Sequence, residues 1–477
     1  MKYETVIGLE VHVHLNTKTK AFCGCRTEFG REPNSQVCPV CLGFPGSLPV
    51  LNKAAFEHAI KVGLALNCSI SEFTKFDRKN YFYPDLPKNY QISQYDLPLA
   101  ECGFLDIDVG GSIKRIGIKR VHLEEDAGKL IHQKELSLVD FNRTGIPLLE
   151  IVSDPQINSP EEAHEYLIRL KSLIEYLDVS DCDMEKGSLR CDANISIRKA
   201  GDKELGVKTE LKNMNSFKAV RDALDFENKR QTELLEGGGK IIRETRLWDA
   251  QNLVTISMRT KEEAKDYRYF PEPDLPPFII KKEQIEQIKK SIPELPREKI
   301  SRFIKEYGLT EYEAEIITSL RKDADFAEEC FRAYSGKDKK PVINYLIGPM
   351  LAEANNRNCS LSGLKVKPLG LIELLGFIGR NEISQLSAKE VLKEMIETMK
   401  MPGEIIKDKN LIQISDSETL KEIAEEVIKL NPKSCQDYKS GKANALMFLI
   451  GQVMKKTQGK ADPKAVQDIL KRRLLNE

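Results

Sequence analysis

The sequence lacks a net charge and lacks any long hydrophobic run. Its 73 lysine and arginine residues balance 73 aspartate and glutamate residues, so a nucleic-acid contact would need a local basic patch. No run of about 18 apolar residues could span a membrane, and the start MKYETVIGLE lacks the features of a signal peptide. We therefore expect a cytoplasmic protein, and 477 residues allow two or three domains.

Two common catalytic motifs are also missing. No G-x-x-x-x-G-K-[ST] phosphate loop occurs, and GGGK at 237–240 lacks the first glycine at the required spacing. A serine nucleophile elbow is absent as well. A nucleotide site in this chain would therefore not be of the Walker type.

The 11 cysteines are an odd number in a chain without a secretion signal, which favours thiols or metal sites over disulfides. Cys23, Cys25, Cys38 and Cys41 form C-x-C, twelve residues, then C-x-x-C. This pattern predicts a closed structural zinc site, with Gly24 and Gly43 permitting close backbone approach. Unrelated buried thiols and an iron–sulfur cluster are the alternatives. Cys191 is expected in the core.

The segment TVIGLEVHVHL at 5–15 predicts a strand with two unlike faces. Val11, Val13 and Leu15 make an apolar face, whereas Glu10, His12 and His14 make a polar one. Next-but-one side chains on a strand are roughly 7 Å apart, so Glu10 and His12 can converge on one ion or phosphate. The alternative is an antiparallel strand with a solvated face.

Four further strand-like segments also carry a polar face. In PLLEIVS, a buried Glu150 would have to be paired or bound to a metal. Other polar positions are Glu124, Glu125 and Asp126 after KRIGIKRVHL, Arg190, Asp192, Asn194, Ser196 and Arg198 in SLRCDANISIR, and Glu210 in VKTELKN. Together they predict a concave sheet whose polar face is a site. An open sheet with a wet face is the alternative.

Such a residue set suits Mg²⁺ and a nucleotide, since Mg²⁺ takes carboxylates and substrate phosphates. Lys79 and Lys88, in KFDRKNYFYPDLPKNYQISQYD, could neutralise a transferring phosphoryl group. The aromatic residues of that segment could stack on a base.

Long motifs of this chain resemble the GatB family of tRNA-dependent amidotransferase components. They include VIGLEVHVHL, KFDRKNYFYPDLPKNYQISQYD, HLEEDAGK, DFNRTGIPLLEIVSDP, GSLRCDANIS, ELKNMNSF and DYRYFPEPDLPP, and the resemblance runs from residue 5 to the end. It implies an α+β fold. A cradle domain with a mostly antiparallel sheet and flanking helices would occupy 1–290, with a zinc-binding insert at about 20–45. An all-α domain at 291–405 and a YqeY-like helical tail at 406–477 would follow.

The resemblance also implies a GatCAB heterotrimer with the glutaminase GatA and with GatC. ATP and Mg²⁺ would serve to phosphorylate the side-chain carboxylate of Glu-tRNA(Gln) or Asp-tRNA(Asn), and ammonia from GatA would then form the amide. The family's metal cluster falls on His12, Glu125 and Glu150, with Glu10 and Glu124 close by. Further expected site residues are Lys79, Lys88, Asp192 and Glu210 for the chemistry, and Arg190 and Asn194 for binding. Zinc would be structural.

The end of the sequence is locally basic. Residues 433–473 hold ten basic residues against three acidic ones, a balance of +7 that suits contact with a phosphate backbone. The basic residues are Lys433, Lys439, Lys442, Lys455, Lys456, Lys460, Lys464, Lys471, Arg472 and Arg473. The family resemblance makes this tail the expected tRNA contact. A free-standing ATP-dependent ligase for a small carboxylic acid and a non-catalytic, zinc-containing tRNA scaffold are the rival interpretations.

Overall fold

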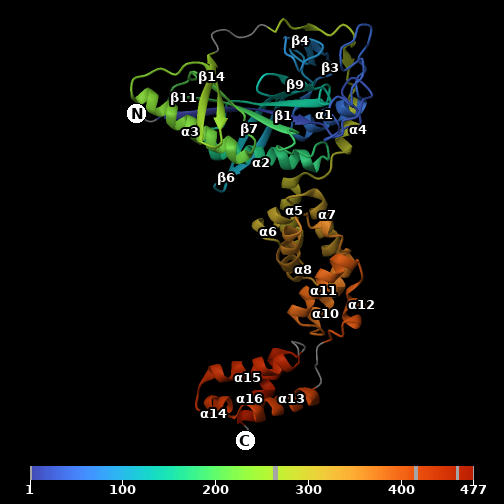
Figure 1. Ribbon diagram of the computed structural model, residues 1–477, viewed down its shortest axis with the longest axis vertical. Coiled ribbons are helices and arrows are strands. Elements are labelled where there is room, and N and C mark those ends of the chain that lie inside the picture. Colours follow the sequence, from blue (N-terminus) through green and yellow to red (C-terminus); the bar gives the residue numbers. More distant parts are fainter. Residues whose placement is uncertain (1–2, 261–266, 413–416, 458–460, 476–477) are drawn as a thin grey trace. The chain divides into compact units, whose positions relative to one another are not determined.

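A computed structural model describes residues 3–260, 267–412, 417–457 and 461–475 (Figure 1). The chain forms two compact units, Met1–Leu295 and Pro296–Glu477, which we describe separately. The first combines a large sheet with helices and the second is helical, so the expected α+β class is confirmed. Within the described ranges, no helix is both long and apolar enough to cross a membrane.

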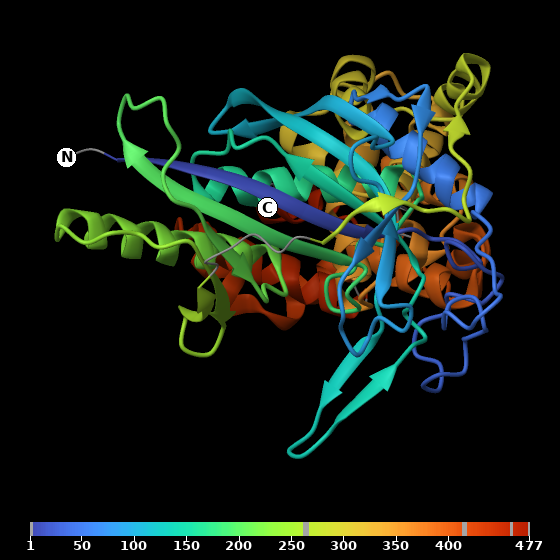
Figure 2. The ribbon, with the colours of Figure 1, turned by 90° about the horizontal axis from the view of Figure 1, so that it is seen from above.

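The first unit is built on a nine-stranded sheet in the order β14-β13-β12-β11-β1-β10-β7-β6-β2. All neighbouring strands are antiparallel except β12 and β13. Figure 2 shows β1 running through the middle of this sheet. The strands are β1 Tyr3–His14, β2 Ser69–Ile70, β6 Ala100–Val109, β7 Ser112–Glu125, β10 Pro147–Ser153, β11 Leu189–Lys199, β12 Thr209–Lys212, β13 Glu244–Asp249 and β14 Val254–Thr260.

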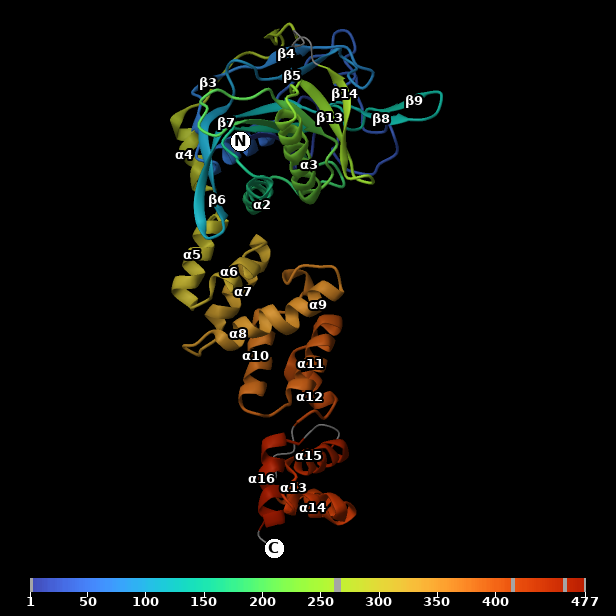
Figure 3. The ribbon, with the colours of Figure 1, turned by 90° about the vertical axis from the view of Figure 1, so that its left-hand side faces the viewer.

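One face of the sheet is apolar and lies against helices. The expected apolar residues Val11, Val13 and Cys191 are at most 3% exposed, which confirms the period-2 interpretation of these strands. Helices α1 Lys53–Ala65, α2 Pro160–Tyr176 and α3 Phe217–Glu236 cover this face (Figure 3). Each helix begins where a capping side chain, Asn52, Ser159 or Ser216, accepts a hydrogen bond from a first-turn amide.

The other face is polar, and smaller elements lie over it (Figures 1 and 3). A three-stranded sheet joins β15 Phe270–Pro271, β4 Asp77–Asn80 and β5 Tyr90–Ser93. Strands β3 Phe73–Thr74 and β16 Phe278–Ile279 pair with each other, and β8 Lys129–His132 and β9 Ser137–Asp140 form a projecting hairpin (Figure 2). Helix α4 Lys282–Lys290 completes the unit.

The second unit has two hydrophobic cores. The first core includes Phe303, Phe331, Leu371, Ile405 and Ile406. Its helices are α5 Pro296–Tyr307, α6 Glu311–Ile317, α7 Arg321–Ala333, α8 Lys340–Tyr345, η1 Leu346–Met350, α9 Leu351–Asn356, η2 Ser362–Leu364, α10 Pro368–Gly379, α11 Gln385–Thr398 and α12 Pro402–Asp408. The expected domain boundary at 406 thus falls inside α12.

Four further helices share a separate core. It is formed by residues such as Leu420, Leu449 and Leu470. The helices are α13 Ser417–Leu430, α14 Pro432–Lys439, α15 Ala443–Lys456 and α16 Pro463–Leu475. The expected link at 408–416 lies partly outside the described residues, as does Lys460.

Candidate active site

Three buried or half-buried acids surround His12 on the polar face of the sheet. The Nε2 atom of His12 lies 3.4 Å from Glu150, 3.8 Å from Glu10 and 4.0 Å from Glu124. The register explains the cluster, since His12 on β1 is opposite Glu150 on β10. Arg120 lies 3.4 Å from Glu150 on the other side. Glu150 is therefore paired, as the sequence led us to expect of a buried carboxylate.

His122 on β7 extends the cluster. Its Nε2 lies 3.6 Å from Glu124 and 3.5 Å from Glu150. Among the described residues, possible ligand atoms within 4.8 Å of one another come from Glu10, His12 and Glu150, and from His122, Glu124 and Glu150. The buried Nδ1 of His122 has no hydrogen-bond partner in the described part of the chain. A set rich in carboxylates with such an atom fits a divalent cation.

The charges of this cluster are strongly coupled. Burial alone would raise the pKa of Glu150, but His122, His12 and Lys79 hold it well below its usual range. Burial and the negative charge of Glu150 raise the pKa of Glu10. Burial opposes the charge on His12, yet Glu150, Glu124 and Glu10 raise its pKa overall. The cluster is thus an electronegative point that attracts a cation.

Glu125 faces away from this cluster, because neighbours on a strand point to opposite faces. Its carboxylate makes an ion pair with Lys88, whose side chain is 7% exposed, and accepts a hydrogen bond of 2.9 Å from the amide of Ile92. Among the described residues, Glu125 belongs to neither group of clustered ligand atoms. The structure therefore groups Glu125 with Lys88 rather than with His12 and Glu150.

Asp126 anchors a second cluster. His14 lies 2.6 Å from its carboxylate, Arg190 donates a hydrogen bond of 2.9 Å to it, and Arg143 lies 3.5 Å away. Burial alone would raise the pKa of Asp126, but Arg190, His14 and Arg143 lower it far below the usual range. The sequence suggested Asp126 as part of a cation site. In the structure it instead orients a histidine and two arginines.

A cavity of about 860 Å³ opens beside the second cluster. His14, Arg143, Arg190, Asp192 and Asn213 are among the residues that line it. Small-molecule sites commonly have volumes of about 300–1,000 Å³. The cavity is therefore large enough for a nucleotide or for an aminoacylated adenosine.

The polar row continues across β11 and β12. Lys212 makes an ion pair with Asp192 and lies 3.4 Å from Glu210, and Glu210 accepts a hydrogen bond of 2.8 Å from Thr245. Burial would lower the pKa of Lys212, but Asp192 and Glu210 raise it. Asn194 is half-buried and lies in register with Glu210. Lys212 and Thr245 were not among the residues identified from sequence.

Lys79, on β4, reaches this face from the smaller sheet. Its Nζ lies 5.0 Å from the ring centre of Tyr267. Burial would lower its pKa, but Glu124 and Tyr269 are the main groups that raise it overall. Tyr269 stacks on Tyr95 with ring centres 4.1 Å apart. A fixed ammonium group thus stands near the acid cluster.

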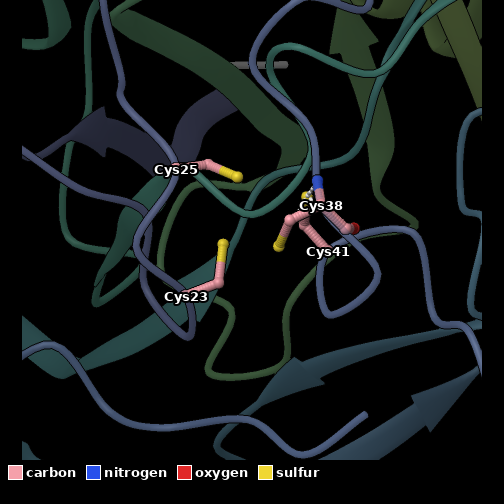
Figure 4. Close-up of side chains that lie close together, drawn as sticks. All are labelled: Cys23, Cys25, Cys38 and Cys41. Atoms are coloured by element: carbon pink, nitrogen blue, oxygen red, sulfur yellow. Dashed lines mark hydrogen bonds between the residues drawn. The ribbon is translucent and has the colours of Figure 1, made fainter.

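The four cysteines come together as the spacing predicted (Figure 4). Their sulfur atoms lie within 4.8 Å of one another, and Cys38 and Cys41 are 3.9 Å apart at sulfur. A hydrogen bond with Cys23 lowers the pKa of the Cys41 thiol to about 4, and Lys20 contributes. A thiolate in a compact S₄ set fits tetrahedral zinc.

The two glycines expected to permit close approach in this loop differ. Gly43 has φ +71° and lies against Lys88, whereas nothing lies within 4 Å of a methyl group placed at Gly24. The expectation for Gly24 was wrong, because its surroundings leave room for a side chain.

Several residues of the site carry no local sequence signal. His122, Arg120 and Tyr267 reach it only through pairing between distant strands, and Lys20 is a fully buried lysine. A buried-face histidine in HLEED could have been noted from the same period-2 argument that selected His12. Lys20 could not, because nothing near it in sequence predicts its burial.

Comparison with known proteins agrees with these observations. The GatB/GatE catalytic domain model matches residues 5–286, and a GatB domain model matches residues 325–474. A relative from Carboxydothermus hydrogenoformans is 55% identical over 478 residues, covering 99% of this chain and 99% of the relative. One from Thermoanaerobacter sp. is 56% identical, covering 99% and 100%, and one from Brevibacillus brevis is 53% identical, covering 98% and 99%. All three carry the name of the GatB component of an aspartyl/glutamyl-tRNA(Asn/Gln) amidotransferase.

Proposed function

This chain belongs to the GatB/GatE family, and from that premise we propose that it is the GatB component of an aspartyl/glutamyl-tRNA(Asn/Gln) amidotransferase. The enzyme is a glutamine-dependent carbon–nitrogen ligase that works as a GatCAB heterotrimer. GatA supplies ammonia from glutamine, and this chain amidates the side-chain carboxylate of Glu-tRNA(Gln), Asp-tRNA(Asn) or both.

The reaction has two steps on this chain. A carboxylate is a poor acylating agent, so its oxygen first attacks the γ-phosphorus of ATP, and the bond to ADP breaks to leave an acyl phosphate. Ammonia then attacks the acyl carbon, inorganic phosphate leaves, and one proton is lost from nitrogen to give the amide. Phosphoryl transfer needs positioning and charge neutralisation more than a protein nucleophile, which matches a site of acids, histidines and lysines.

The His12 cluster is the proposed Mg²⁺ site, with Glu10, His12, Glu124 and Glu150 as ligands and His122 beside them. Bound Mg²⁺ would hold the nucleotide phosphates and neutralise their charge. Arg120 keeps Glu150 in place from the opposite side. Glu125, which the family resemblance puts in this metal cluster, is proposed to act through Lys88 instead.

The neighbouring residues have proposed roles in binding and charge neutralisation. Lys79 and Lys88 offer ammonium groups to the transferring phosphoryl group or along the path of ammonia. Arg190 and Asp192 line the cavity that would receive a nucleotide or the aminoacyl end of tRNA. Asn194 and Glu210 continue the polar row, and Lys212 holds Asp192 and Glu210 together.

Two further assignments complete the proposal. Cys23, Cys25, Cys38 and Cys41 hold a structural zinc ion, for which their compact sulfur set is the support. Helices α13–α16, with their own core, form the tail that contacts tRNA. The proposed division is a cradle domain up to Leu295, a helical domain through α12 and this tail.

The acid cluster around His12 is the observation that carries the catalytic proposal. The test is to purify the chain with its GatA and GatC partners and to assay amidation of each misacylated tRNA with and without ATP. We expect ATP-dependent amidation, also when ammonium replaces glutamine. Amidation of a small free acid without tRNA would favour a free-standing ligase. An unchanged rate after loss of the acid cluster would favour a non-catalytic scaffold.

A further inference from the structure

The cysteine loop that holds Cys38 and Cys41 touches the Lys88–Glu125 ion pair. Gly43 in this loop has a left-handed backbone, and a methyl group there would lie 2.5 Å from Cγ and 3.1 Å from Cα of Lys88. Carbon atoms do not approach that closely, so the loop backbone lies directly against Lys88. A shift of the loop would therefore reach the side chain that neutralises Glu125.

The same cysteine site approaches Glu125 from another direction. At Gly145, where φ is +83°, a methyl group would lie 3.5 Å from Lys20, 3.6 Å from Cβ of Cys41 and 3.8 Å from Oε2 of Glu125. One small residue thus separates a metal-binding cysteine from the carboxylate. Both members of the ion pair border the four-cysteine site.

Lys20 ties the cysteine site to this region electrostatically. It is fully buried, its Nζ lies 3.7 Å from Sγ of Cys41, and it donates a hydrogen bond of 3.3 Å to the carbonyl of Phe141. A buried ammonium is costly unless an anion compensates it. Four thiolates around a divalent ion carry two negative charges in total, so Lys20 is matched to the metal-bound state.

We propose that the four-cysteine loop is a positioning element for the Lys88–Glu125 ion pair, and that metal occupancy of the cysteines thereby controls the ATP-dependent step. This inference rests on the proposed function of Lys88 and Glu125. Without metal, Cys38 and Cys41 lose their tie to Cys23 and Cys25, and the loop no longer forms a fixed wall against Lys88. The cysteine site is then structural in chemistry but coupled to catalysis through packing.

The first test measures access to Lys88 rather than activity. The purified complex is loaded with zinc or stripped by a chelator, pulsed with an amine-acylating reagent, and analysed by peptide mass spectrometry. We expect metal removal to raise the labelling of Lys88 several-fold, while Lys299, a buried lysine in the helical unit, keeps its protection. Equal labelling of Lys88 in both states would overturn the proposal. A joint rise at Lys88 and Lys299 would also overturn it, because the metal would then stabilise the chain as a whole.

The second test uses two glycines of the same loop. Gly43→Ala places a methyl group against Lys88, whereas Gly46→Ala, at φ +81°, carries the same backbone strain with nothing within 4 Å. We expect both variants to retain about one zinc per chain. In Gly43→Ala, kcat for amidation should fall on the order of 100-fold with an unchanged KM for aminoacyl-tRNA, as small misplacements do. Gly46→Ala should keep the parental kcat.

Equal kcat values for the two glycine variants would contradict the proposal, as would a loss confined to KM. If the parental complex shows no ATP-dependent amidation, the proposed function fails. The labelling of Lys88 would still decide whether the metal site and the ion pair are coupled.

Discussion

A carboxylate such as Glu150 can remain ionised in a buried position because His12, His122 and Arg120 face its oxygens. Removing one member of such a cluster leaves the others uncompensated. The residues of the cluster are therefore expected to act as a unit, and single substitutions should cost nearly as much as multiple ones.

Substitution within the cluster should stop the phosphoryl-transfer step. Glu150→Gln and His12→Ala are each expected to lower tRNA-dependent ATP hydrolysis by about 100-fold or more, because each removes a proposed metal ligand. Glutamine hydrolysis by GatA, measured without tRNA, should be unchanged. Glu4→Gln is the matched control, since Glu4 lies on the same strand as His12 but pairs with Arg198. Parental ATP hydrolysis in both cluster variants would show that the Mg²⁺ site is misplaced.

Between elements, the contact of α5 with α7 depends on a buried ion pair. Arg302 donates hydrogen bonds of 2.8 and 3.0 Å to Glu328, and Arg332 and Tyr307 also face that carboxylate. These hydrogen bonds, first of all those from Arg302, hold the pKa of Glu328 at about 2 although burial opposes them. Since the pKa is lower in the folded chain, its stabilisation is present above the unfolded pKa of about 4.5 and is lost as the pH falls toward 2.

Glu328→Gln should therefore destabilise this helix contact by about 2–3 kcal/mol at pH 7. The difference from the parent should shrink steadily below about pH 4.5. Hydrogen exchange of the α5 and α7 amides in the full chain measures it locally. Glu329→Gln is a control on the same helix. A penalty for Glu328→Gln that is the same at pH 7 and pH 3 would refute the pKa argument.

The cysteine loop should bind zinc as an element of its own. Metal analysis of the chain purified under reducing conditions without chelator should find about one zinc per chain. Cys41→Ser should abolish this occupancy, because thiolate is the ligand that zinc prefers here. Cys359→Ser, an exposed cysteine in the helical unit, should leave it unchanged. An absence of zinc in the parental protein would remove the assignment.

The elements differ in how far sequence could predict them. The period-2 pattern of β1 and β11 predicted which residues are buried, because side-chain alternation is a local property. The cysteine cluster followed from spacing that one loop satisfies. The Lys88–Glu125 pair and the place of His122 beside Glu150 depend on strands that are far apart in sequence. Neither local pattern nor composition carries that information.

Over the whole molecule, the helical tail has its own core and a basic surface that is partly neutralised. Arg473 lies 2.7 Å from Glu425, and Lys456 pairs with Glu426, both on α13. Lys455 and Arg472 are exposed. The +7 balance of residues 433–473 therefore overstates the charge that the tail offers to a partner, because α13 lies outside that count.

Removing the chain after residue 412 should raise the KM for aminoacyl-tRNA by about tenfold or more, because phosphate contacts supply affinity rather than turnover. Glutamine hydrolysis without tRNA should hardly change. Lys455→Ala with Arg472→Ala should lower the salt dependence of tRNA binding by about two counterions. Lys409→Ala, a cation in ion pairs outside the tail, is the control. A stable truncated complex with undiminished tRNA affinity would exclude a role of the tail in binding.

The central place of β1 also has a consequence for synthesis on the ribosome. This first strand forms ladders with β10 at Pro147–Ser153 and with β11 at Leu189–Lys199, one on each edge. At roughly 5–20 residues per second, both of its edges wait on the order of ten seconds or more for partners to emerge. An apolar strand with two open edges is prone to pair with other chains in that interval. The nascent cradle should therefore need chaperone protection until residue 199 has left the ribosome, and the pulse-labelled chain should become protease-resistant only after that point.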